Sequence, residues 1–285
     1  MPRLIWQELK FRRNAIIGWG LGLCFFPIVY IGIYPSVADQ MASLTDLAIY
    51  QYMGMNLNTF GNWVGSILLV FMPLIASVYA IINSTGTLAG EEEDGRLEMM
   101  VTLPLPRWQI IVAKAIAISL ALLIILALVA GVSLLVFGAL QNQVETDVTG
   151  INIFMAVLSV WPLTFAMGMI GLFLAVFAPS RRVALMLAAA VLIVGYLGPN
   201  LAASTTALEP LEPFFLFSYL DSSGQAIREG QWAGDMLVLI LAGLAALALA
   251  IFFFARRNLT VGVWPWQRPK VARPHSAVQP PLIKE

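Results

Sequence analysis

Residues 110–140 decide the fold, and they read IIVAKAIAISLALLIILALVAGVSLLVFGAL. Lys114 is the one charged residue of this run and lies near its start. A helix rises about 1.5 Å per residue and the hydrocarbon core of a membrane is about 30 Å thick, so roughly 20 apolar residues are enough to cross it. The run is longer than that and lacks the polar–apolar alternation of barrel strands. It therefore predicts a membrane-spanning helix that projects beyond the bilayer, because lipid satisfies no free backbone groups.

Five further runs are apolar and long enough to cross a membrane. They cover residues 15–37, 63–82, 154–178, 183–201 and 236–255. The composition agrees, since 60% of the chain is hydrophobic and only 11% is charged, whereas globular proteins carry about 25% charged residues. We predict an all-α integral membrane fold with six transmembrane helices.

The organisation along the chain follows from these runs. Residues 1–14 are predicted to form an interfacial amphipathic helix, residues 15–260 the six-span domain, and residues 261–285 a disordered cytoplasmic tail rich in proline and polar residues. Pro27, Pro73 and Pro162 lie inside predicted spans, and Gly198-Pro199 closes the fifth. These prolines are either hinges or the ordinary prolines of membrane helices.

The basic residues indicate the orientation of the chain in the membrane. The N-terminal segment, the loops after spans two and four, and the segment after span six hold 15 of the 16 lysines and arginines, and Arg228 is the exception. Loops rich in lysine and arginine stay in the cytoplasm. We therefore expect a multi-pass protein of the cell membrane with both termini in the cytoplasm.

The loop between spans two and three is the most informative segment for function. Residues 90–107 read GEEEDGRLEMMVTLPLPR. Acidic residues are favoured at a helix N-terminus, and Leu97, Met100 and Val101 recur at helical spacing. The segment therefore predicts a short helix with a charged start and an apolar face. Pro104 and Pro106 are expected to end this helix. Such a helix is either a docking element or a solvated charged loop.

Two other segments border the spans. Residues 2–13 read PRLIWQELKFRR, in which Glu8 and Arg12 are spaced as an i, i+4 ion pair. This segment is either an interfacial helix whose basic residues face lipid head groups or a plain positive flank. Residues 208–221, LEPLEPFFLFSYLD, follow span five. They form either an external gate or a loop packed on the bundle, and the gate residues would be Pro213, Phe214, Phe215, Phe217 and Tyr219.

Several functional classes are excluded or disfavoured by the sequence. The net charge is zero, which argues against nucleic-acid binding, and the lone Cys24 and lone His275 leave no disulfide and no histidine metal site. No Walker motif GxxxxGK[ST] occurs. No carboxylate or histidine lies within the spans to activate a nucleophile, so the spans hold no catalytic pair and an intramembrane enzyme is a weak alternative. A non-transporting membrane scaffold is a second weak alternative. The hydroxyl candidates for such an enzyme are Ser66, Ser77, Ser119, Ser133, Ser159 and Thr164.

The acidic loop resembles that of the type-2 ABC transporter permeases. In that family a Glu–Glu–x–x–Gly–x–Leu–Glu run precedes a Leu–Pro–x–x–Arg turn and a basic residue in the next helix. Here the corresponding residues are Glu92 to Glu98, Leu103 to Arg107, and Lys114, with a mismatch of one position before Gly95. The layout of an N-terminal helix, six spans and a long segment between spans five and six is also similar, over about residues 1–260.

The resemblance implies a prokaryotic export permease rather than an enzyme. A separate ABC ATPase subunit would bind ATP and Mg, and this chain would bind no cofactor or metal. A second permease subunit, either identical or different, would complete the transporter. The surrounding partners would be membrane lipids. The substrate stays open. The implied ATPase-coupling loop comprises Glu91, Glu92, Glu93, Asp94, Gly95, Arg96, Leu97, Glu98, Met100, Val101, Pro104 and Arg107.

Overall fold

The computed structural model describes residues 1–44, 59–93, 106–143, 146–205 and 207–256. Helices are the regular secondary structure of these ranges. They are α1 (Pro2–Leu44), α3 (Phe60–Glu93), α5 (Arg107–Leu140), α6 (Gly150–Leu158), α7 (Trp161–Phe177), α8 (Arg181–Ser204), the 3₁₀ helices η1 (Glu209–Phe214) and η2 (Leu216–Tyr219), α9 (Gly224–Glu229) and α10 (Ala233–Arg256). Within the described residues, α1, α3, α5, α6 with α7, α8 and α10 are long and apolar enough to cross a membrane, which confirms the predicted all-α fold with six spans.

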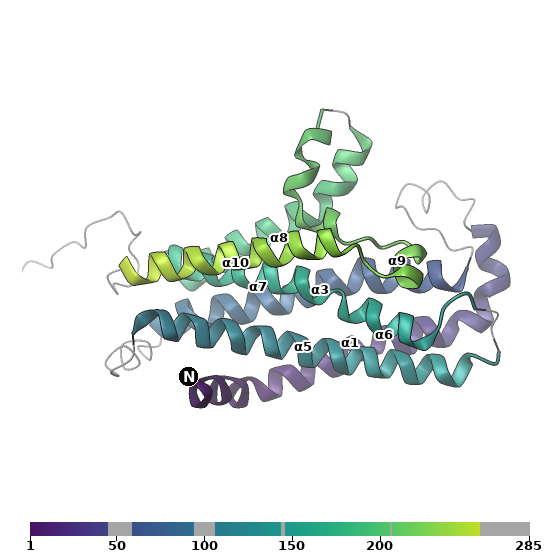
Figure 1. Ribbon diagram of the computed structural model, residues 1–285, viewed down its shortest axis with the longest axis horizontal. Coiled ribbons are helices and arrows are strands. Elements are labelled where there is room, and N and C mark those ends of the chain that lie inside the picture. Colours follow the sequence, from purple (N-terminus) through teal and green to yellow (C-terminus); the bar gives the residue numbers. More distant parts are fainter. Residues whose placement is uncertain (45–58, 94–105, 144–145, 206, 257–285) are drawn as a thin grey trace, which may run out of the picture.

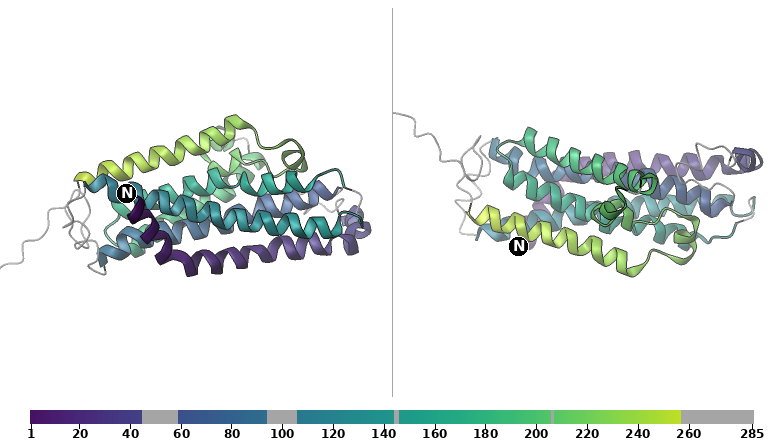
Figure 2. Two further views of the ribbon diagram at one scale, coloured as in Figure 1. Left: turned by 60° about the horizontal axis from the view of Figure 1, so that its bottom comes forward. Right: turned by 90° about the horizontal axis from the view of Figure 1, so that it is seen from above.

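The long helices lie side by side along the long axis of the molecule (Figure 1; Figure 2). The end of the bundle at which α1 begins is called here the proximal end, and the opposite end the distal end. Other helix ends also lie at the proximal end: the end of α3 at Glu93, the start of α5 at Arg107, the start of α8 at Arg181 and the end of α10 at Arg256. The segment from α3 to α5 therefore leaves and re-enters the bundle at the end where the N-terminus lies.

The middle of the bundle is built on α3 and α7, the two most buried spans. Helix α7 packs against both α3 and α10, and α1 packs along α5. Glycines permit close approach: a Cβ atom at Gly243 of α10 would lie 2.6 Å from the ring of Phe165 on α7. Lipid tails are as apolar as the side chains of the helices, so no hydrophobic force drives helices together within a membrane. Close contacts through small residues are therefore a main source of the packing energy between helices.

The fourth span is broken into α6 and α7, where the sequence predicted one helix. Helix α6 begins with a capping box, in which Thr149 and Asn152 satisfy each other's backbone amides. It ends at Leu158, and Pro162 lies in the first turn of α7. Proline has no amide hydrogen and is best accommodated in the first turn of a helix, and Pro162 has this position in α7.

Helix α1 is one continuous helix from Pro2 to Leu44, so residues 2–14 are the beginning of the first span's helix. The fifth span also differs from the prediction, because Pro199 lies inside α8 and the helix continues to Ser204. The last part of α8 and the segment holding η1 and η2 lie together and stand out from the side of the bundle (Figure 1).

Candidate functional site

The predicted coupling loop begins inside a helix. Glu91, Glu92 and Glu93 are the last three residues of α3, whereas the sequence predicted that they open a separate helix. The C-terminal end of a helix carries a partial negative charge, so the favourable dipole invoked for these carboxylates is absent. Asp94, Gly95, Arg96, Leu97, Glu98, Met100, Val101 and Pro104 lie outside the described residues.

The loop re-enters the bundle at Arg107, the half-buried first residue of α5. Pro106 precedes it in an extended conformation, and the predicted short helix that Pro104 and Pro106 would end lies outside the described residues. Because Glu93 and Arg107 both lie at the proximal end, the undescribed residues between them connect the neighbouring ends of α3 and α5.

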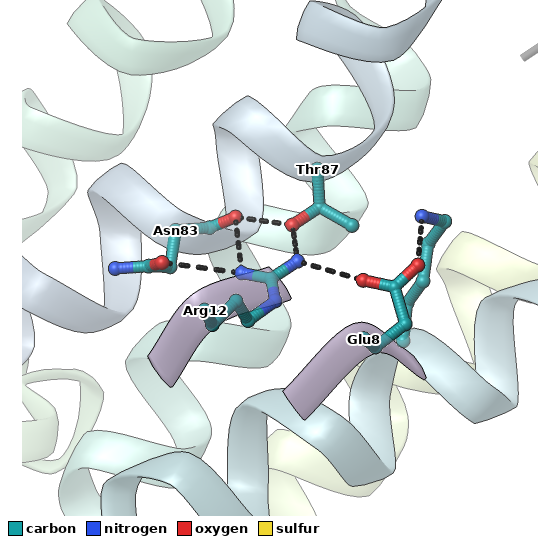
Figure 3. Close-up of polar contacts among 5 residues, drawn as sticks. Glu8, Arg12, Asn83 and Thr87 are labelled. Carbon is teal, nitrogen blue, oxygen red and sulfur yellow. Dashed lines mark hydrogen bonds and ion pairs between the residues drawn. The ribbon is translucent and has the colours of Figure 1, made fainter. Parts of the chain in front are cut away.

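Buried charges from two helices meet at this proximal end. Lys114 of α5 lies about two turns beyond Arg107 and is only 1% exposed. Its Nζ donates to Glu8 Oε1 of α1 at 2.7 Å, and the other carboxylate oxygen, Oε2, lies 3.3 Å from Arg12 Nη2 (Figure 3). Glu8 is thus the shared partner of two cations, and the predicted i, i+4 pair of Glu8 with Arg12 is confirmed.

Arg12 extends the cluster to α3. Its Nη1 donates to Asn83 through both the backbone oxygen, at 3.3 Å, and Oδ1, at 3.2 Å, and its Nη2 donates to the hydroxyl of Thr87 (Figure 3). Asn83 Nδ2 in turn donates to the carbonyl of Tyr79, one turn back in α3. Glu8, Arg12, Asn83, Thr87 and Lys114, named the proximal cluster, therefore tie α1 to the ends of α3 and α5 that flank the coupling loop.

The burial of Arg12 corrects the expectation that this basic residue faces lipid head groups. Only 7% of Arg12 is exposed, whereas Lys10 and Arg13 are exposed as expected. A charge is costly to bury unless it is paired and hydrogen-bonded, and Arg12 meets that condition with its two terminal nitrogens. Its Nε has no partner among the described residues.

Sequence reasoning noted Lys114 and the Glu8–Arg12 pair but missed that they form one cluster. Glu8 and Lys114 are 106 positions apart, and Arg12 and Thr87 are 75 apart. A local pattern contains no information on such pairs. The one signal was Lys114 itself, because an ionisable residue in an apolar helix requires a partner.

The predicted gate residues pack beside the bundle. Phe217 meets Tyr196 of α8 edge-on with ring centroids 5.4 Å apart, and the Tyr219 hydroxyl donates to the carbonyl of Pro213 at 2.9 Å. Phe215 lies against Gly198 of α8, while 79% of Phe214 is exposed. These contacts place the segment along α8 and not over the end of the bundle.

The deeply seated part of this external segment is α9, which sequence reasoning did not single out. Ile227 is 2% exposed, and a Cβ atom at Gly65 of α3 would lie 3.0 Å from the carbonyl oxygen of Ser222. Arg228 forms an ion pair with Asp147, which also accepts a hydrogen bond from the backbone of Gly61. Helix α9 is therefore fixed to α3 and to the connection between α5 and α6.

Three of the six hydroxyl groups considered for an enzyme bond to carbonyls of their own helices, whereas Ser77 Oγ is buried without a hydrogen-bond partner among the described residues. Ser133 donates to the carbonyl of Val129 at 2.8 Å, Ser159 to that of Ala156 at 2.7 Å, and Thr164 to that of Trp161 at 3.0 Å. This back-bonding is the ordinary state of serine and threonine in helices. It differs from an activated nucleophile, which contacts a general base.

The chain was compared with known proteins. The model of a family described as "ABC-2 family transporter protein" matches residues 3–259. No curated protein matches the chain. The family match spans α1 to α10, and so it includes the proximal cluster, the predicted coupling loop and the segment between α8 and α10.

Proposed function

Because the chain belongs to the ABC-2 family of transporter proteins, we propose that it is an export permease driven by a separate ATPase subunit that docks on residues 91–107. Its place as a membrane permease subunit of an ABC transporter follows from the family. The direction of transport, the docking surface and the partner chains are the proposal. In it, the proximal end faces the cytoplasm of a prokaryotic cell, and ATP and Mg are bound by the partner.

The observation that carries the proposal is the proximal cluster. The coupling loop joins α3 to α5, and Lys114, Asn83 and Thr87 lie within two or three turns of its ends. Through Glu8 and Arg12, the same residues hold α1. A force applied to the loop by an ATPase would thus act on three spans together, because the hydrogen bonds and ion pairs between them are buried and strong.

The acidic run supports a cationic docking surface on the ATPase. Glu91 to Glu93 end α3, where the helix dipole opposes them. A basic surface on a partner would offset both the mutual repulsion and the dipole. In the proposal a second permease subunit, either another copy or a related chain, completes the path through the membrane.

A charge-reversal experiment tests the docking surface. The variant Glu93→Lys with Glu98→Lys is expressed together with candidate ATPase chains and purified from the membrane. We expect it to reach the membrane at the level of the unaltered protein but to retain the ATPase at least tenfold less. The matched control is Glu209→Lys with Glu212→Lys, two exposed carboxylates of η1. Retention of the ATPase at the unaltered level by the Glu93–Glu98 variant would overturn the proposed docking surface.

A further inference from the structure

A cavity of about 560 Å³ lies away from the proximal cluster, between α6, the start of α7, α9 and the first turns of α10. Its volume is in the range of small-molecule sites. Neither the coupling loop nor the predicted gate residues line it. Its position at the junction of four elements gives it walls from segments that are distant in sequence.

The lining of the cavity is divided into a polar and an apolar part. Asn152, Arg228, Glu229 and Gln231 supply polar groups. They belong to the first turn of α6, the end of α9 and the connection from α9 to α10. Gly230, at φ 88°, turns the chain between them, a backbone conformation that glycine adopts at no steric cost.

The apolar part of the lining comes from the end of α6, the start of α7 and the first turns of α10. Met155, Trp161, Met236 and Ile240 form it, together with Pro162 at the start of α7. Ser159, at the break between α6 and α7, lines the same wall. Irregular backbone at membrane depth is tolerated where it is buried in protein or lines a cavity, so the break and the cavity belong to one feature.

The surroundings of the cavity are apolar and exposed. Ile151 and Met155 of α6 are 57% and 56% exposed, and Leu135 of α5 is 74% exposed. Gly150 at the start of α6 approaches Leu134, so this part of α5 is level with the polar lining. In a membrane protein such a belt faces lipid, and the molecules in reach of the cavity are lipids.

One charge of the polar lining is already neutralised within the chain. Arg228 is paired with Asp147, and its carbonyl accepts a hydrogen bond from Asn152 Nδ2 at 2.8 Å. Glu229 Oε2 accepts one from Gln225 Nε2 at 3.0 Å. Because Arg228 is neutralised by Asp147 and the amide of Gln231 is bonded to the backbone of Asp221, the lining keeps the negative charge of Glu229, which suits a zwitterionic head group with a cationic part better than an anionic one.

We propose that this cavity binds a membrane amphiphile whose head group has no net charge, such as a zwitterionic phospholipid. The cationic part of the head group lies at Glu229, beside Asn152, and an acyl chain follows Met155 and Trp161 toward Ile240. The polar head group thus contacts the polar part of the wall, and the acyl chain contacts the apolar part. The binding is a property of this chain alone and does not depend on the docking of an ATPase.

Tryptophan quenching by brominated phosphatidylcholine tests the proposal on the purified full chain in detergent. Bromine atoms in the acyl chain quench only fluorophores that they approach. The contribution of Trp161 to the fluorescence is the difference between the emission of the unaltered chain and that of the Trp161→Phe variant. We expect this difference to fall by at least half and to saturate near one lipid per chain, while brominated phosphatidylglycerol requires at least a tenfold higher concentration.

A label attached after folding closes the cavity without risk to folding. In a Cys24→Ala background, Met155→Cys is reacted with a bulky maleimide, which we expect to abolish the saturable quenching. Met186→Cys, a 63% exposed methionine position on α8 outside the cavity, is the matched control and keeps it. Quenching that never saturates, that survives the label at position 155, or that phosphatidylglycerol produces at equal concentration overturns the proposal.

Discussion

Glu8 is the residue on which the proximal cluster depends, because it is the carboxylate that both Arg12 and Lys114 contact. The three charges sum to one excess positive charge. Such a cluster is tolerated because the backbone and side chain of Asn83 and the hydroxyl of Thr87 take up the donors of Arg12. Removal of the carboxylate would take away the partner that Arg12 and Lys114 share in a site from which water is largely excluded.

We predict that Glu8→Gln destabilises the protein by about 3–5 kcal/mol, the cost of breaking a buried ion pair. Thermal unfolding in detergent, followed by the loss of monodisperse protein, measures this change. The exposed Glu209→Gln is the control and should unfold with the unaltered chain. Adding Lys114→Met to Glu8→Gln should recover part of the loss, since an apolar side chain needs no counter-ion; an unchanged transition in Glu8→Gln would contradict the prediction.

At the scale of elements, the contacts between helices depend on residues that have almost no side chain. Gly171 of α7 lies directly against the hydroxyl of Ser84 on α3, and Gly243 of α10 lies against the ring of Phe165. The second contact is the less forgiving one, because a buried aromatic ring has few alternative positions. Gly131 of α5, in contrast, faces open space.

We predict that Gly243→Ala destabilises the packing of α10 on α7 by about 1–3 kcal/mol, the usual cost of overpacking a core. Gly131→Ala is the matched control, because its added methyl meets nothing within 4 Å and alanine favours the helix. Melting temperatures of the two variants in the same detergent provide the comparison. If the two temperatures were equal, the close approach of α10 to α7 would not be a source of stability.

The element boundaries show which features a sequence predicts well. The six spans were predicted because the length of an apolar run is a local property. The break at Ser159 was missed, since residues on both sides of it are equally apolar and Pro162 was as compatible with a kink as with a new helix. The extension of α3 through Glu93 was also missed, because a run of carboxylates is typical of a helix start.

At the scale of the whole molecule, the described basic residues gather at one end. Arg3, Lys10, Arg107, Arg182 and Arg256 all belong to proximal helix ends, and Arg228 lies in α9 near the distal end. The side-by-side spans therefore reproduce in space the asymmetry that was counted along the sequence. The proximal cluster itself could not be predicted, because its partners come from three helices.

We predict that the distal end is extracellular. In a Cys24→Ala background, Asn142→Cys and Arg182→Cys replace exposed residues at the distal and proximal ends. A membrane-impermeant maleimide added to intact cells should label position 142 and should label position 182 only after permeabilisation. The reverse pattern would invert the topology and place the coupling loop outside the cell.

The proximal cluster also sets an order on the synthesis of the chain. Glu8 and Arg12 leave the ribosome first, but Asn83 is made 71 residues after Arg12, and Lys114 is made 106 residues after Glu8. At about 5–20 residues per second, Lys114 follows Glu8 after roughly 5–20 s. During that interval the newborn first helix carries charges without their final partners. The cluster can be completed only when the third span, which holds Lys114, has been made.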